Sequence, residues 1–241
     1  MDFTYREYEY ILDLLRHKGY SFTNYKDYNF VKNPVILRHD IDFSLEKALI
    51  FANLENAKNI KSTYFVLLST NFYNVFSKES GDILKNIKEM GHDIGLHFDE
   101  KKYIINSERE LEYWVKEEIT YLSGVLRSPV NIVSMHRPSK WILDNDIHFD
   151  GLINTYSKTF ISDFKYISDS RMHWREDVLD IIEKQLHKKL HILTHPFWYS
   201  EKVEKMKEKL LVFINNAKVE RYNYLTNNLR GIDDIIDGVE L

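Results

Sequence analysis

The sequence contains no cysteine, which excludes disulfide bonds and cysteine nucleophiles. Its 241 residues include only 4 prolines and 8 glycines, and no stretch has the composition of a flexible linker. The longest apolar runs are a few residues long, far shorter than a bilayer-spanning helix. A net charge of −4 gives no electrostatic basis for binding nucleic acid or an anionic membrane. A soluble globular protein without these partners is therefore expected.

The composition is that of an ordinary folded protein, with 44% hydrophobic and 29% charged residues. Neither a shift in composition nor an internal repeat divides the chain. We therefore expect residues 1–241 to form a single domain, with its core motifs at about 34–200. The first residues, MDFTYRE, lack the apolar segment of a secretory signal. Unless a leader has been removed, the expected location is the cytoplasm.

Short apolar segments rich in β-branched residues alternate with helical patterns along the chain. Most of these segments are continuous rather than alternating, which is typical of strands covered on both faces. They lie at residues 34–39, 62–68, 93–97, 131–136, 151–155, 165–168 and 190–195. Helices are indicated between them, with Ser44 and Ser107 as candidate caps, Gly91 as a helix end and 201–217 as an amphipathic segment. The pattern predicts an α/β fold with a parallel sheet or a distorted (β/α) barrel.

Ionisable side chains follow most of the predicted strands. In parallel β/α folds the carboxyl ends of the strands meet at one face, where functional groups gather. Taken alone, a polar residue at a strand end is more often a turn former or a cap than a ligand. Here five of the seven predicted strands end in such residues, within Arg38-His39-Asp40-Ile41-Asp42, His97-Phe98-Asp99, His136-Arg137-Pro138, Ser168-Asp169-Ser170 and Thr194-His195-Pro196. Their convergence predicts a site at that face.

The pair Asp40 and Asp42 points to metal-assisted hydrolysis. Their i, i+2 spacing places both carboxylates on one side of an extended segment. One can ligate a divalent ion while the other accepts a proton from the water that the ion activates. Imidazole and carboxylate groups together are common zinc ligands. An alternative for Asp42 is to cap the helix near Ser44, and His39 and His92 are interpreted as structural.

Several motifs together resemble the polysaccharide deacetylases of carbohydrate esterase family 4, the NodB-homology domain. The phrases are LRHDID at 37–42, STYF at 62–65, GHDIGLHFD at 91–99, HRPS at 136–139, YISDS at 166–170 and ILTHPFWY at 192–199. The pairing of the first phrase with GHDIGLHFD is the specific one. The resemblance covers about residues 34–200 and is strongest to a divergent group found among surface-polysaccharide biosynthesis proteins.

The resemblance implies a distorted barrel and removal of an N-acetyl group from an amino sugar. It assigns Asp40 as the base, Asp42 as the metal-binding aspartate and His97 as a metal-binding histidine. Arg137 matches the arginine that orients the base, with His136 as an alternative alignment. His195 matches the acid that protonates the leaving amine. Asp169 matches the carboxylate that orients this acid, although the usual D-x-x-D-W pattern is missing.

One position departs from the family pattern. The second metal-binding histidine of the family stands four residues after the first, and here that residue is Lys101. An ammonium group cannot ligate a cation, so another residue must complete the site if a metal binds. His136 is the favoured third ligand because it would keep two histidines and one aspartate. Asp99, which shares a strand face with His97, is the alternative.

The expected activity is therefore metal-dependent N-deacetylation of a sugar in a surface glycan or its precursor, with zinc as the expected ion. Phe197, Trp198 and Tyr199 directly follow His195 and can stack on a sugar ring, or else anchor their loop on the barrel rim. Because of Lys101, a catalytically inactive protein that binds a glycan or a partner is the alternative. A third possibility is an amidase acting on a non-sugar amide or cyclic imide.

Overall fold

The computed structural model describes residues 1–236 and contains one parallel sheet. Along the sheet the strands follow the order β6-β5-β4-β3-β2-β8-β7, and the short β1 also pairs with β2. The strands are β1 (Ser21–Thr23), β2 (Pro34–Ile41), β3 (Thr63–Val66), β4 (Asp93–Phe98), β5 (Ile132–Met135), β6 (Ile153–Asn154), β7 (Lys165–Ser168) and β8 (Leu190–Thr194). Every pairing is parallel.

The sheet curls into a distorted, open barrel. Arg38 of β2 donates to the hydroxyl of Thr155, just after β6, at 3.4 Å. Three strands lie between β2 and β6 in the sheet, so these side chains meet only because the sheet curves around its interior. The α/β fold with a distorted barrel predicted from the sequence is thus confirmed. Its description as a single domain stays a prediction.

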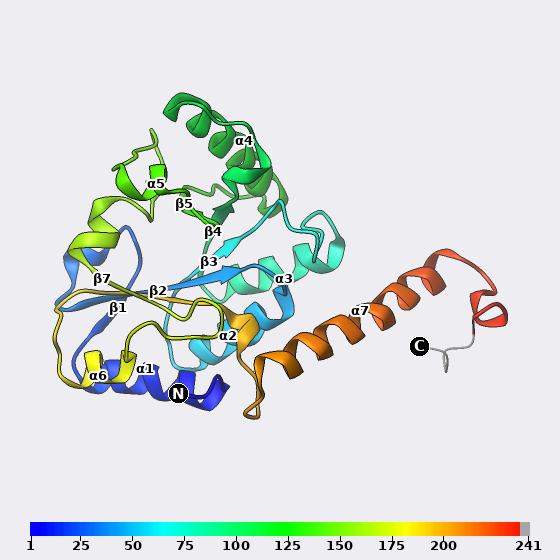
Figure 1. Cartoon of the computed structure of the whole chain (residues 1–241), viewed down its shortest axis with the longest axis horizontal. Helices are drawn as coiled ribbons and strands as arrows, with labels where there is room; N and C mark the ends of the chain where they lie inside the picture. The colour runs from blue at the N-terminus through cyan, green and yellow to red at the C-terminus, as the bar shows by residue number, and fades with distance from the viewer. Residues whose placement is uncertain (237–241) are drawn as a thin grey trace.

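Helices cover the outside of the sheet (Figure 1). They are α1 (Tyr5–His17), α2 (Leu45–Ala57), α3 (Lys78–Glu89), α4 (Glu108–Leu126), α5 (Lys140–Asp144), α6 (Val178–Glu183) and α7 (Met206–Asn228). The last of these extends away from the sheet, as Figure 1 shows. In the described part of the chain, no helix combines the length and apolarity needed to cross a membrane.

The strands are buried on both faces, as their continuous apolar runs predicted. All eight residues of β2 are buried. Toward the helices, Leu37 and Ile41 join the large outer core. Toward the barrel interior, Ile36 packs with Phe65 of β3 and Ile132 of β5. Because alternate residues of a strand face opposite sides, the interior also receives Arg38 and Asp40.

All seven predicted strands are present, but the sequence missed β1, α1, α5 and α6. Ser44 and Ser107 cap α2 and α4 through hydrogen bonds to backbone N–H groups three residues on. Gly91 follows the end of α3 with a left-handed φ of 88°. The last helix begins at Met206 rather than at 201 and continues past 217. The strand β1 has only three partly buried residues and therefore carries little hydrophobic signal.

Gly95 of β4 should be essential for packing inside the barrel. A Cβ atom there would overlap the buried ring of Phe65 and lie 3.1 Å from the Ile132 carbonyl oxygen. Gly95→Ala should therefore lower the free energy of unfolding by about 1–3 kcal/mol through overpacking. Gly81, in α3, has open space around its Cβ position, so Gly81→Ala should be neutral or stabilising. Urea denaturation midpoints of the two variants test this contrast; equal midpoints would contradict it.

Candidate active site

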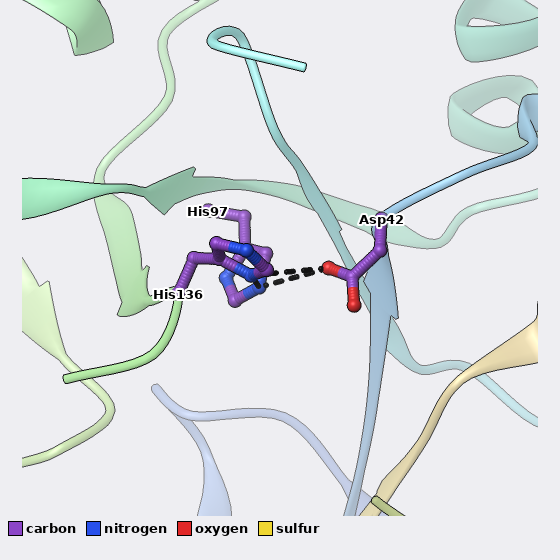
Figure 2. Close-up of side chains that lie close together, drawn as sticks. All are labelled: Asp42, His97 and His136. Atoms are coloured by element: carbon purple, nitrogen blue, oxygen red, sulfur yellow. Dashed lines mark hydrogen bonds and ion pairs between the residues drawn. The ribbon is translucent and has the colours of Figure 1, made fainter. Parts of the chain in front are cut away.

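The predicted functional residues lie at the carboxyl ends of β2, β4, β5, β7 and β8. His97 of β4 is paired in register with Ser134 of β5, so His136 follows two residues further along the same face. Asp42 follows directly after the end of β2. The sheet therefore brings together side chains that are more than 90 residues apart in sequence. Figure 2 shows that Asp42, His97 and His136 point toward one another.

Asp42, His97 and His136 form a compact group of possible metal ligands. The Asp42 Oδ1 atom lies 3.3 Å from His97 Nε2 and 3.3 Å from His136 Nδ1. The two imidazole nitrogens are 3.1 Å apart. Ligand atoms at the usual zinc distances from a tetrahedral ion are separated by roughly 3.3 Å from one another. The three donor atoms therefore have the spacing that a tetrahedral site requires.

The protonation pattern of the group also fits a cation. His97 Nδ1 lies 2.7 Å from Ser134 Oγ; in the tautomer that donates to this hydroxyl, the Nε2 lone pair faces the group. Without a cation, a proton must separate the lone pairs of His97 and His136, whereas a bound ion would accept both. Burial alone would raise the pKa of Asp42, but in the ion-free protein, where the imidazole nitrogens that face it carry protons, hydrogen bonds from His136 and His97 and the charge of His195 hold it well below its usual range. The carboxylate is therefore available as an anionic ligand.

Asp40 lies beside this group and is held by Arg38. Its carboxylate is 3.5 Å from His97 Nε2. Arg38 donates from Nε to Oδ1 and from a terminal nitrogen to Oδ2, both at 2.8 Å. The two side chains are 0% and 3% exposed, so this is a bidentate ion pair shielded from water. Burial would raise the pKa of Asp40, but the charge of Arg38, aided by His97, lowers it.

Arg38, to which the sequence interpretation gave no role, holds the carboxylate of Asp40. Its guanidinium lies 5.3 Å from the ring centroid of Phe65 and 5.0 Å from that of Tyr156. The i, i+2 spacing of Arg38 and Asp40, which places both on one strand face, is the signal that could have identified it. The same rule was applied to Asp40 and Asp42.

The expectation that Arg137 orients Asp40 does not fit this geometry. Arg137 donates to Asp99 Oδ2 at 2.7 Å, and its side chain is 59% exposed. It follows β5 with a left-handed φ of 51°, where the chain has already left the sheet. Asp40 lies inside the barrel and has both oxygens occupied by Arg38. Asp99 uses Oδ2 for Arg137 and Oδ1 for the backbone N–H of Lys101, and it stands outside the group of three ligands.

His195 and Asp169 are paired as the sequence predicted. His195 Nδ1 lies 2.6 Å from Asp169 Oδ1, and Asp169 also accepts from the His195 backbone N–H. On the other side of the ring, Nε2 is 3.9 Å from Asp42 Oδ2. Burial would lower the pKa of His195, but the charge and hydrogen bond of Asp169, with Asp42 and Asp40 beyond it, raise it to about 9. The ring thus lies at the edge of the ligand group, between Asp169 and Asp42.

The three aromatic residues after His195 are buried rather than displayed. Phe197 and Trp198 are each 8% exposed, and Tyr199 is fully buried. Phe197 packs against Phe43 at 4.7 Å between ring centroids, and Tyr199 packs against the core of α1 and α2. The prediction that they stack on a sugar is therefore not supported. The alternative, a loop anchored on the barrel rim, agrees with their burial.

A buried polar network supports the site from behind the sheet. His39 Nε2 lies 2.8 Å from Glu55 and its Nδ1 lies 2.7 Å from Thr194 Oγ1. The same carboxylate accepts hydrogen bonds from Tyr8, Ser62 and Tyr64, each at 2.6 Å. All members are buried, so the network ties α1 and α2 to β2, β3 and β8 without access to substrate. The structural interpretations of His39 and, at its margin, His92 agree with this position.

No protein-family model and no curated protein matches the sequence. Similar solved structures include a carbohydrate esterase family 4 pseudoenzyme from Bacillus anthracis, at 14% identity, 77% of this chain, 62% of that chain and a TM-score of 0.45. Others are the catalytic domain of a peptidoglycan N-acetylglucosamine deacetylase from Eubacterium rectale (15% identity, 77% and 86% of the chains, TM-score 0.48) and a chitin deacetylase from Colletotrichum lindemuthianum (13%, 83% and 86%, 0.46). The chain spans 62–64% of the three pseudoenzyme structures of Bacillus anthracis. The motifs had indicated a resemblance to this same family.

If His136 is the third ligand, His136→Ala should weaken zinc binding by at least about tenfold. Lys101→Ala and Asp99→Asn should leave it nearly unchanged, because neither side chain belongs to the ligand group. Competition with a chromogenic chelator measures the three affinities. Zinc binding that survives in His136→Ala and is lost in Asp99→Asn would identify Asp99 as the ligand instead.

Proposed function

We propose that this protein is a metal-dependent hydrolase that removes the N-acetyl group from an amino sugar. The observation that carries the proposal is the group of Asp42, His97 and His136. The pairs Arg38–Asp40 and Asp169–His195 lie beside it. A possible ligand set, a buried carboxylate and a protonated imidazole occur together at one strand-end face. Hydrolysis of an unactivated amide requires these three components: an activated water, an acceptor for its proton, and a donor to the leaving amine.

Asp42, His97 and His136 would hold the ion through one carboxylate oxygen and two imidazole nitrogens. A divalent ion bound there, with zinc the best match to this donor set, would supply Lewis acidity toward the amide carbonyl and activate a water. Ser134 would keep His97 in the tautomer that presents Nε2. The positive charge of a bound ion would itself keep Asp42 in its anionic form.

Asp40 is proposed to accept the proton of the attacking water. It stands 3.5 Å from His97 Nε2, next to the ligand group. Arg38 fixes both of its oxygens and keeps it ionised. A base held this way has its direction set before substrate arrives, which is the arrangement that general-base catalysis favours.

His195 is proposed to give its proton to the departing amine. It is 3.9 Å from Asp42, on a different strand from the two histidines, and its raised pKa keeps it protonated at neutral pH. Asp169 fixes the ring through Nδ1, so that Nε2 carries the transferable proton. The leaving nitrogen would thus receive its proton from a group that is already oriented.

The substrate is proposed to be an N-acetylated sugar in a surface glycan or its precursor, handled in the cytoplasm. Lys101 favours one competing function, a protein that keeps the site but only binds a glycan or a partner, because the chain lacks the histidine that its motif predicts there. Turnover by the wild-type protein decides between the two. An amidase for a non-sugar amide would release no acetate from any sugar while hydrolysing its own substrate.

The decisive experiment measures metal content by mass spectrometry and acetate release from N-acetylated sugars, per mole of folded protein. Asp40→Asn should retain the metal but lose about 10²–10⁴-fold in turnover, whereas Asp42→Asn should lose metal and turnover together. Arg38→Lys should reduce kcat with metal content unchanged, since an ammonium cannot hold both Asp40 oxygens. Wild-type protein without metal, and without hydrolysis after addition of zinc, cobalt or manganese, would contradict the proposal.

The alkaline limb of the rate profile should report His195. Because the protonated ring is required, kcat/KM should fall as pH rises through about 9. In Asp169→Asn the burial that lowers the pKa remains while the charge that raises it is gone, so the limb should move to lower pH. The profiles of wild type, Asp169→Asn and His195→Gln are the measurement. An unmoved limb in Asp169→Asn would show that another group titrates.

A further inference from the structure

The carboxylate of Asp99 holds two cationic residues at the rim of the ligand group. Its Oδ2 accepts from Arg137 at 2.7 Å, and its Oδ1 accepts from the backbone N–H of Lys101 at 3.1 Å. Asp99 itself is buried, whereas the Arg137 side chain is 59% exposed. The Arg137 guanidinium thus covers the Asp99 carboxylate, and the outer side of the guanidinium is open to solvent.

Most of the hydrogen-bonding capacity of Arg137 is unused. A guanidinium carries five N–H donors, and the bond to Asp99 uses one of them. Within residues 1–236 no second acceptor contacts this side chain. Arg38 shows the contrast, because it engages Asp40 through two donors and reaches Thr155 with a third nitrogen.

Arg137 follows one of the possible metal ligands directly in the chain. This ligand is His136, whose Nδ1 is 3.3 Å from Asp42. Asp99 stands two residues after His97, on the adjacent strand end. Both strands that supply the histidines therefore also supply Asp99 and Arg137, so this ion pair lies at the same end of the sheet as the ligand group.

Two cationic side chains at this rim keep free donors. Arg137 pairs with Asp99 through one donor, and the exposed Lys101 contacts Asp99 through its backbone N–H. The neighbouring Glu100 accepts from the Ser139 backbone N–H, and Lys102 is paired with Glu118 at 3.1 Å. The formal charges of these six residues cancel, three cations against three carboxylates, but within residues 1–236 the ammonium group of Lys101 has no carboxylate partner.

We propose that Arg137, assisted by Lys101, binds an anionic group of the substrate, a phosphate or a carboxylate, and so selects acidic N-acetyl amino sugars over neutral ones. The inference rests on the proposed function and names its substrate class. A planar guanidinium with free parallel donors matches the oxygen pairs of both anions. Since Arg38 holds Asp40, Arg137 is not needed to orient the base and serves as a specificity-determining residue.

The test compares kcat/KM for N-acetylglucosamine 1-phosphate, N-acetylmuramic acid and the neutral methyl N-acetylglucosaminide. Arg137→Gln should lower kcat/KM for at least one acidic sugar by about 10–100-fold, mainly through KM, the usual effect of losing a charge-assisted hydrogen bond. The methyl glycoside should change less than about twofold. Lys101→Gln should show a smaller loss in the same direction. The acidic sugar with the larger loss of kcat/KM shows whether Arg137 binds a phosphate or a carboxylate.

Arg127→Gln is the matched control. Arg127 also has a left-handed φ, of 49°, but it follows α4 at the opposite end of β5. It should leave all three substrates unchanged. An equal loss on acidic and neutral sugars in Arg137→Gln, or no loss on any, would overturn the inference.

Equilibrium binding separates this inference from the proposed function. Calorimetry with N-acetylglucosamine 1-phosphate and N-acetylmuramic acid requires no turnover. If neither is hydrolysed, but one binds wild type and binds Arg137→Gln at least about tenfold more weakly, the anion site stands while the deacetylase proposal fails. If neither acidic sugar binds the wild type more tightly than the methyl glycoside does, the anion site is wrong.

Discussion

The buried ion pair between Arg38 and Asp40 is the interaction on which the rest of the site depends. A charge inside a barrel is costly unless its partner satisfies it fully, and here two hydrogen bonds of 2.8 Å do so. Phe65 and Tyr156 cover the guanidinium, and Thr155 takes its remaining side. Arg38 and Asp40 thus fill part of the barrel interior that apolar side chains would otherwise occupy. The pair of Arg38 and Asp40 therefore belongs both to the packing of the barrel and to the candidate site.

A second buried carboxylate fixes the strands that carry Asp40 and His195. Glu55 of α2 binds His39, which neighbours Asp40 in β2, and His39 meets Thr194, which neighbours His195 after β8. The two partners are also paired in the β2–β8 register. Because adjacent strand residues face opposite sides, a contact behind the sheet sets the relative position of Asp40 and His195 in front of it. Glu55, His39 and Thr194 follow one another in the order carboxylate, imidazole, hydroxyl, as in a hydrolytic triad. Because all three are buried, we interpret this network as structural.

Arg38, and not Arg137, contacts Asp40, and the two arginines differ in their surroundings. Arg38 lies inside and is saturated with partners, while Arg137 lies at the rim and is mostly open. Deep in the barrel, desolvation makes a pair strong and permanent; at the rim, a guanidinium can exchange water for a ligand. Burial also decides the role of the aromatic residues after His195. Tyr199 could stack on a sugar, but it is buried and packs in the core.

The sequence by itself determined the strands β2 to β8 and the polar residues that follow them. Continuous apolar runs marked β2 to β8, and the i, i+2 rule placed Asp40 and Asp42 together, because both signals are local and periodic. The weak strand β1 had no such signal. Only the tertiary structure decided which distant groups meet: that His136 joins Asp42 and His97, that Arg38 rather than Arg137 reaches Asp40, and that Phe197, Trp198 and Tyr199 turn inward. These outcomes depend on the curl of the sheet and on where each loop leaves it, which are set by packing among residues far apart in the chain.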